Sequence, residues 1–151
     1  MTKAETIKIL TLLSAFYGEG KAEAEIMAAA WHELLYEYEY FIVRRAVMEY
    51  AKSDVREYAS FPTPGRLIEA IEHESALYRL VFNKMLQGND YSELPERGKA
   101  LISESEYDSE KAEPYEDKLA RKEEIIERLK AEDRRAWITA QKKTNERKHL
   151  T

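Results

Sequence analysis

The sequence predicts an all-α protein: a small helical bundle, an acidic linker and a C-terminal amphipathic helix. Three observations favour this class. Only 5 Gly and 4 Pro occur among 151 residues, fewer than an all-β fold needs for its turns. Apolar residues recur at helical spacing along most of the chain, and no segment is a good candidate for a strand. Charged residues make up 35% of the chain, as expected for helices with one solvated face.

Four helices are expected in the first half of the chain. Gly18 ends the first, because glycine readily adopts the left-handed conformation of a C-cap. A residue before proline avoids the helical region, so the fourth helix begins with Thr63 as its N-cap and Pro64 at the first helical position. The expected ranges are 3–17, about 22–39, about 41–52 and about 64–74.

One apolar face on each of these helices predicts the core of the bundle. In the second helix, for example, Met27, Trp31, Leu34 and Tyr38 step by 4, 3 and 4 residues, which places them on one stripe. The side chains expected to build the scaffold are Leu13, Phe16, Trp31, Leu34, Val43, Val47, Leu67 and Ile71.

The second half of the chain separates its charges. Residues 76–87 predict another apolar helix, and Leu94 starts a short helix that runs to about Ile102. Acidic residues then dominate a segment with almost no aliphatic side chains, which cannot bury enough surface to offset its ordering entropy. Strong helix formers fill about 116–148. We therefore expect a bundle domain over 1–102, an acidic linker over 103–117 and a basic amphipathic helix over 118–151, with net charges of −4, −6 and +5.

No catalytic or metal-binding pattern is evident. The chain has no cysteine, which excludes disulfides and Cys-based zinc sites. None of His32, His73 and His149 has a second ligand at metal spacing on the same helix face. The run Gly18–Lys21 is shorter than a Walker A loop and follows no strand. We expect a protein that is not an enzyme and that binds no metal or cofactor.

The sequence also gives no sign of a membrane span or of export. No run reaches the about 18 apolar residues that a span needs. The first residues, MTKAETIKILTLL, lack the basic, apolar and small-residue order of a secretory signal. The expected location is the cytoplasm, with no membrane partner.

The C-terminal segment is the main candidate for partner binding. Trp137 lies in a basic helix beside Arg134 and Arg135, and Leu129 shares its apolar stripe. Such a stripe is too thin to be stable alone, so we expect it to contact something else. Three partners are open: the body of the same molecule, another protein, or an acidic polymer. The acidic linker would compete with nucleic acid for the same cations, so nucleic acid is not expected to be the primary partner.

Tyrosines on the bundle give a second candidate surface. Tyr36 and Tyr40 step by four residues on a face other than that of Trp31. An exposed tyrosine is favoured at protein interfaces because it contributes contact area at low entropic cost. Tyr36 and Tyr40 are therefore candidate interface residues on the bundle.

The landmarks of the first half form a recognisable series. They are Phe16-Tyr17, Trp31-x-x-Leu34-Leu35, Tyr38-Glu39-Tyr40-x-x-Val43, Ala46-Val47-x-x-Tyr50 and Phe61-Pro62-x-Pro64-x-x-Leu67-Ile68. With these motifs the chain resembles, over about residues 5–72, the N-terminal domain of the helicase loader and inhibitor proteins of phages that infect Gram-positive bacteria.

The resemblance implies a phage DNA replication adaptor in the bacterial host cytoplasm. Such a protein binds a hexameric DnaB-type replicative helicase, holds it inactive and delivers it to the origin through a replication initiator protein. In that family the C-terminal part carries much of the helicase contact. Two other functions are open: a nucleic-acid-binding phage replication protein that uses the basic tail, and an inhibitor of a host protein.

Overall fold

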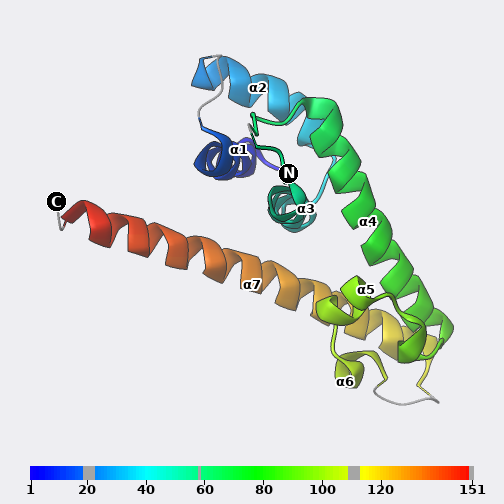
Figure 1. Cartoon of the computed structure of the whole chain (residues 1–151). Coiled ribbons are helices and arrows are strands. Elements are labelled where there is room, and N and C mark those ends of the chain that lie inside the picture. The colour runs from blue at the N-terminus through cyan, green and yellow to red at the C-terminus, as the bar shows by residue number, and fades with distance from the viewer. Residues whose placement is uncertain (19–22, 58, 109–112, 150–151) are drawn as a thin grey trace. The chain divides into compact units, whose positions relative to one another are not determined.

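The computed structural model describes residues 1–18, 23–57, 59–108 and 113–149. Within these ranges no strand occurs, and the all-α prediction is confirmed (Figure 1). A short 3₁₀ helix, η1, covers Tyr91–Glu93. The α-helices are α1 (Lys3–Tyr17), α2 (Ala24–Leu35), α3 (Tyr40–Ser53), α4 (Pro64–Gln87), α5 (Glu96–Leu101), α6 (Glu104–Tyr107) and α7 (Tyr115–His149).

The chain forms two compact units, unit 1 over Met1–Ala76 and unit 2 over Leu77–Thr151. The sequence placed its domain boundaries elsewhere, with a body over 1–102, a linker over 103–117 and a tail over 118–151. That division stays a prediction. The two units share helix α4, which supplies its first half to unit 1 and its second half to unit 2.

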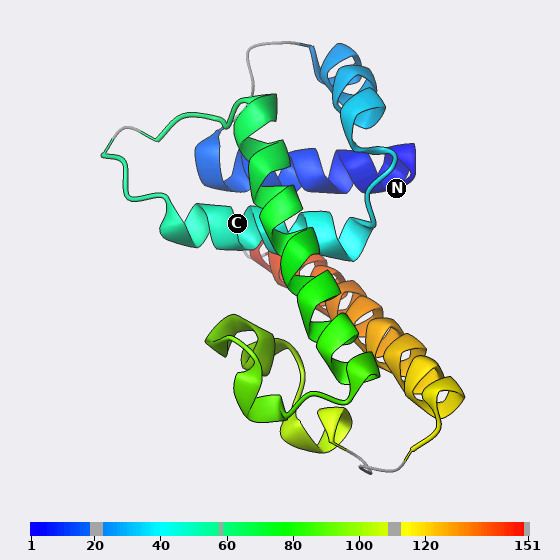
Figure 2. The ribbon, with the colours of Figure 1, turned by 90° about the vertical axis from the view of Figure 1, so that its right-hand side faces the viewer.

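In unit 1, α1 packs against both α2 and α3. Figure 2 shows α1 and α3 side by side, with the first half of α4 crossing them. The core lies between these helices, because each turns one apolar face inward. The buried side chains that form it are Ile9, Leu13, Trp31, Leu35, Val43, Ala46, Val47, Leu67 and Ile71.

The predicted helix ends of unit 1 are confirmed where a capping residue defines them. Thr2 caps α1 in a capping box with Glu5. Gly18 ends α1 with φ of +79°, a conformation that favours glycine. Thr63 Oγ1 accepts the backbone N–H of Arg66 at 3.4 Å, as an N-cap should.

The prediction that Phe16 and Leu34 lie in the core is wrong, because Phe16 is 46% exposed and Leu34 is 44% exposed. In α2 the buried stripe runs from Trp31 to Leu35, a step of four residues, so Leu35 takes the core position that the apolar spacing predicted for Leu34. In the last turn of α1, the Phe16 ring packs edge-on against Tyr17, with 6.5 Å between the ring centroids. Phe16 therefore covers its neighbour rather than filling the core.

The expected break between two helices near residue 75 is also wrong, because α4 runs without interruption from Pro64 to Gln87. Its buried stripe passes through the supposed break at Glu74, which is 4% exposed. Because this buried position holds a carboxylate, the row of apolar residues is interrupted in the sequence although the buried stripe is continuous. The stripe steps by 4, 3, 4, 3 and 4 residues through Leu67, Ile71, Glu74, Tyr78, Val81 and Met85.

Unit 2 has its own buried residues, drawn from α4, the segment 94–107 and α7. Helix α5 approaches α4 closely at Gly98, where an added Cβ would stand 2.9 Å from Val81 Cγ2. Among the described residues, the buried apolar side chains of this unit are Tyr78, Val81, Phe82, Met85, Leu94, Leu101, Ile102, Tyr107, Ile125 and Leu129.

Part of the expected linker is helical. Ser103 starts α6 through a capping box with Glu106, and Tyr107 at its end is only 4% exposed. The Tyr107 hydroxyl donates to the carbonyl oxygen of Asn89 at 2.7 Å, and its ring packs edge-on against Tyr91. One buried aromatic residue thus helps to order part of a segment that its acidic composition had predicted to be a linker. Residues 109–112 of the expected linker lie outside the described residues.

Candidate partner-binding surfaces

The exposed face of α7 carries cations around an isoleucine. Arg134, Arg135 and Lys142 are exposed, and Ile138 exposes 51% of its surface between them. Ile138 lies four residues after Arg134 and four before Lys142, so these side chains share one side of the helix. We call Arg134, Arg135, Ile138 and Lys142 the basic face of α7. Ile138 was not among the predicted contact residues, although its spacing of four residues from both Arg134 and Lys142 is visible in the sequence.

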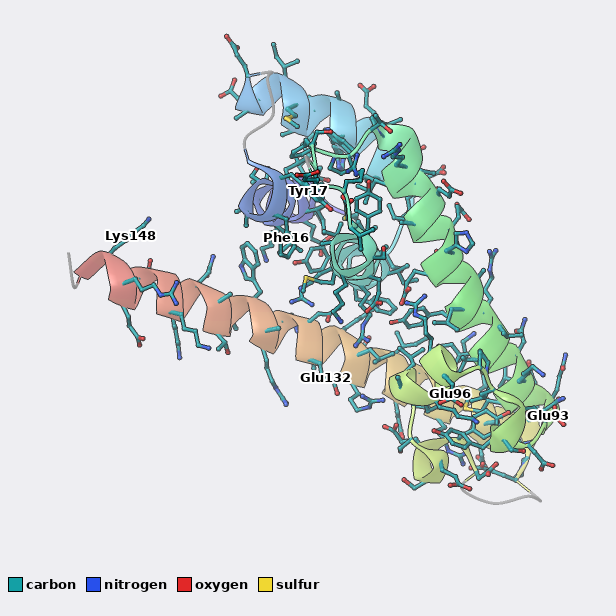
Figure 3. All side chains as sticks on the ribbon, in the orientation of Figure 1. Phe16, Tyr17, Glu93, Glu96, Glu132 and Lys148 are labelled. Atoms are coloured by element: carbon teal, nitrogen blue, oxygen red, sulfur yellow. The ribbon has the colours of Figure 1, made fainter. Side chains whose placement is uncertain are left out.

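The four tail residues predicted to bind a partner lie on two different sides of α7. Leu129 is 1% exposed, and Trp137, eight residues later on the same row, is partly buried. Arg134 and Arg135 project from the exposed side. Figure 3 shows the side chains of α7, with Lys148 labelled near its end and Glu132 at mid-length. The structure thus brings Arg134 and Arg135 together with Ile138, while Leu129 contributes to packing.

In unit 2, Arg128 ties α7 to the segment before it. Its guanidinium forms an ion pair with Glu106, at 2.6 Å from Nε to Oε1, and donates to the carbonyl oxygen of Leu101 at 3.2 Å. Glu132 accepts a further hydrogen bond from Arg128 at 2.7 Å. Desolvation disfavours the charged form of the Glu106 carboxylate. The backbone N–H of Ser103 and the guanidinium of Arg128 outweigh this effect and hold the pKa of Glu106 below its usual range. These contacts fix the helix that carries the basic face.

Tyr36 and Tyr40 do not lie on one helix, because α2 ends at Leu35 and α3 begins at Tyr40. Tyr36 is 54% exposed and remains available to a partner. Its carbonyl oxygen accepts a hydrogen bond from the N-terminal ammonium of Met1 at 2.6 Å. Tyr40 is partly buried, and Lys8 Nζ lies 5.9 Å from the centre of its ring. The structure therefore favours Tyr36 over Tyr40 as an exposed contact.

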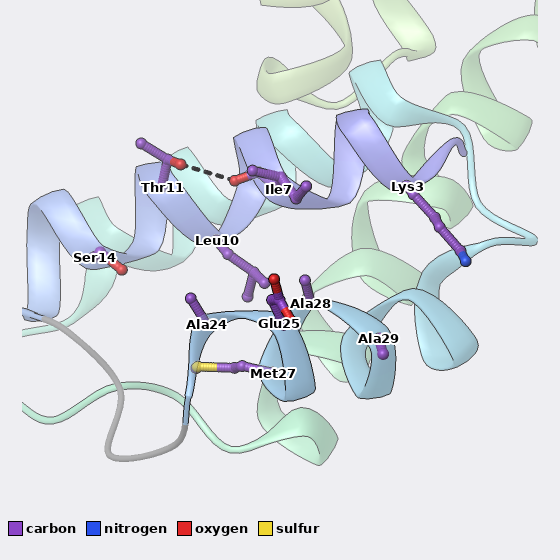
Figure 4. A pocket seen from close by; sticks show the side chains of 10 residues that line it. All are labelled: Lys3, Ile7, Leu10, Thr11, Ser14, Ala24, Glu25, Met27, Ala28 and Ala29. Atoms are coloured by element: carbon purple, nitrogen blue, oxygen red, sulfur yellow. Dashed lines mark hydrogen bonds between the residues drawn. The ribbon is translucent and has the colours of Figure 1, made fainter.

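A groove of about 650 Å³ lies between α1 and α2 (Figure 4). It exists because α2 presents alanines toward α1, and their methyl groups are too short to close the gap. Ile7 on the opposite wall is 53% exposed. The groove was not predicted from the sequence, although the run of alanines in α2 is a signal of it. Its lining residues are Lys3, Ile7, Leu10, Thr11, Ser14, Ala24, Glu25, Met27, Ala28 and Ala29.

A hydrogen-bonded cluster fixes the start of the segment between α3 and α4. The Asp54 carboxylate accepts from the Tyr17 hydroxyl at 3.0 Å and from Arg56 Nη2 at 2.7 Å. The Arg56 guanidinium holds the pKa of Asp54 well below its usual range. Burial and the hydrogen bond to Asp54 raise the pKa of Tyr17 to about 12. Farther along the segment, Phe61 packs edge-on against Trp31, with 6.2 Å between the ring centroids.

Among the residues that the structure describes, no group of three His, Asp or Glu side chains is placed to hold a metal ion. None of the described helices combines the length and the apolar character that crossing a membrane requires. What the described surfaces offer is an apolar groove, an exposed tyrosine and a basic helix face, which are features of protein binding.

Comparison with known proteins finds one family match, and it lies in the first of the two units. Residues 1–68 match the family model for the N-terminal domain of the helicase loader/inhibitor protein of phage SPP1. The resemblance predicted from the sequence over about residues 5–72 is confirmed within this range. The match lies entirely within unit 1 and ends in the second turn of α4. Neither the curated proteins nor the solved structures include a match to this chain.

Proposed function

We propose that this chain, whose residues 1–68 match the N-terminal domain of a phage helicase loader family, is a stoichiometric adaptor for a replicative helicase. In this proposal the helicase is a hexamer of the DnaB type. The adaptor holds it inactive and delivers it to the origin with a replication initiator protein, in the cytoplasm of the bacterial host. The family match is the observation that carries the proposal. No catalytic step by the adaptor is involved.

The basic face of α7 is the proposed contact with the helicase. Its exposed isoleucine offers an apolar anchor, and Arg134, Arg135 and Lys142 surround it with positive charge. An interface of this kind fits an apolar pocket bordered by carboxylates. The adaptor changes the state of the helicase only if it binds one state better than another, so we expect its affinity to depend on the nucleotide bound to the helicase.

The test is a binding titration of the full-length protein with the cognate helicase, with and without ATP, followed by light scattering of the complex. Ile138→Asp should weaken the complex by at least about tenfold, because it places a charge at the apolar anchor. Trp137→Ala should weaken it by a similar factor, with the half-buried indole as a second anchor beside Ile138. Val55→Asp is the matched control, since Val55 is 92% exposed and belongs to unit 1 rather than to α7. The absence of a complex under every condition would refute the proposed function.

The charge of the tail supports a second candidate, direct binding of nucleic acid. Residues 134–149 hold six Lys and Arg against one Glu. Affinity that comes from phosphate contacts falls steeply with rising salt. A titration of labelled DNA with the wild-type chain and with Arg134→Glu/Arg135→Glu tests this candidate. Direct binding of nucleic acid predicts that affinity falls as salt rises and that the variant loses binding.

A further inference from the structure

The α2 side of the groove in unit 1 is acidic. From residue 23 to residue 43 the sequence contains no Lys or Arg. Glu25 lines the groove, and Lys3 on α1 is the other charged residue of its lining. Carboxylates continue along and beyond α2, all of them exposed: Glu23, Glu25, Glu33, Glu37 and Glu39. An apolar groove bordered in this way suits a basic amphipathic helix.

The same chain carries such a helix. The basic face of α7 presents an exposed isoleucine with cations before and after it, and the groove presents exposed apolar side chains beside carboxylates. The charges also have matching spacing. Arg134 and Lys142 are eight residues apart, and so are Glu25 and Glu33, which corresponds to about 12 Å along either helix. Two helices lying alongside each other can therefore pair both charges at once.

We propose that the protein self-associates head to tail, with the basic face of α7 from one copy docked in the α1–α2 groove of a second copy. Ile138 enters the groove between Ile7 and Ala28, and Arg134 and Lys142 lie against the carboxylates of α2. Contact of this kind is heterologous, since the groove and the basic face are different surfaces. Its charged part is solvent-exposed, so salt weakens it. This self-association does not require any particular partner of the adaptor in replication.

The experiment is sedimentation velocity of the full-length protein over a wide concentration range, at low and at high salt. Wild-type chains should associate more as concentration rises and less as salt rises. Ile138→Asp should abolish the association, whereas Val55→Asp, at an exposed valine outside the groove lining, should leave it unchanged. A protein that stays monomeric at every concentration overturns the proposal, and so does association that Ile138→Asp does not weaken.

Charge reversal tests the pairing itself. Glu25→Arg/Glu33→Arg makes the groove basic, and Arg134→Glu/Lys142→Glu makes the tail acidic. Each double variant alone should lose self-association by about tenfold or more, because like charges then face each other. A mixture of the two should regain it, since a basic groove then meets an acidic tail and the native pairing is also present. If mixing restores nothing while circular dichroism shows that both variants are folded, the assigned surfaces are wrong.

Discussion

Replacing Gly65 and Gly98 by alanine should change the free energy of unfolding in opposite directions, although both glycines lie in helices. In a helix interior, alanine is favoured over glycine by about 0.5–1 kcal/mol. At Gly65, in the first turn of α4, an added Cβ meets no atom within 4 Å, so this gain should be realised. At Gly98, in α5, the Cβ would stand 2.9 Å from Val81 Cγ2, which is closer than real Cβ contacts allow.

The cost at Gly98 should exceed the gain. Val81 is fully buried, and a β-branched side chain in a helix has one strongly preferred rotamer, so it cannot rotate away. Forcing an extra methyl group into packed surroundings typically costs about 1–3 kcal/mol. We therefore expect Gly98→Ala to lower the free energy of unfolding by about 1–2 kcal/mol and Gly65→Ala to raise it by about 0.5–1 kcal/mol.

Urea denaturation followed by circular dichroism measures both changes in the full-length protein. Equal slopes in urea for the two variants and the wild type would show that the same surface is exposed on unfolding. If Gly98→Ala stabilises the protein as much as Gly65→Ala does, Gly98 does not lie as close to Val81 as described, and α5 packs on α4 differently.

Three further predictions concern a cap, a titrating pair and a buried leucine. Thr2→Ala removes the N-cap of α1 and should lower the free energy of unfolding by about 1 kcal/mol, measured by urea denaturation, while Thr2→Ser should cost far less. Tyr17→Phe removes the hydrogen bond to Asp54. Because the folded-state pKa of Tyr17 is raised to about 12, the stabilising effect should be full below about pH 10 and fade as pH rises from there towards 12. Stability curves at several pH values test this, and a difference between wild type and variant that grows above pH 10 would contradict it. Leu129→Ala should lower the free energy of unfolding, measured by heat or urea, by about 2–5 kcal/mol, because the side chain is fully buried. A decrease of less than about 0.5 kcal/mol would show that Leu129 belongs to the exposed contact surface instead.

Local signals in the sequence predicted the parts of the fold that depend on local chemistry. The start of α4 follows from Thr63 and Pro64, and the end of α1 follows from Gly18. Periodicity could not resolve choices that tertiary packing makes. Leu34 and Leu35 are equally apolar neighbours, and the direction of the core decides which one is buried. A carboxylate at Glu74 hid the continuity of α4, because apolar periodicity does not register a buried charge.

The candidate surfaces were harder to predict than the helices. The predicted cations Arg134 and Arg135 are exposed, but the apolar side chain between the exposed cations is Ile138 rather than Trp137. Which side of an amphipathic helix stays open depends on how wide its buried stripe is, and that width is set by the neighbouring elements. The groove is a missing volume left by alanines. A sequence pattern shows which side chains are present, and it does not show whether neighbouring helices leave space between them.

The positions of the two tryptophans make the chain its own spectroscopic probe. Trp31 lies in unit 1 and is 6% exposed, whereas Trp137 lies in unit 2 and is partly exposed. A buried indole emits at shorter wavelength and is shielded from a dissolved quencher such as iodide. Replacing either residue by phenylalanine would leave a single fluorophore that reports on one unit. Melting followed by fluorescence in the two variants would then reveal whether the halves of the molecule unfold together or in succession.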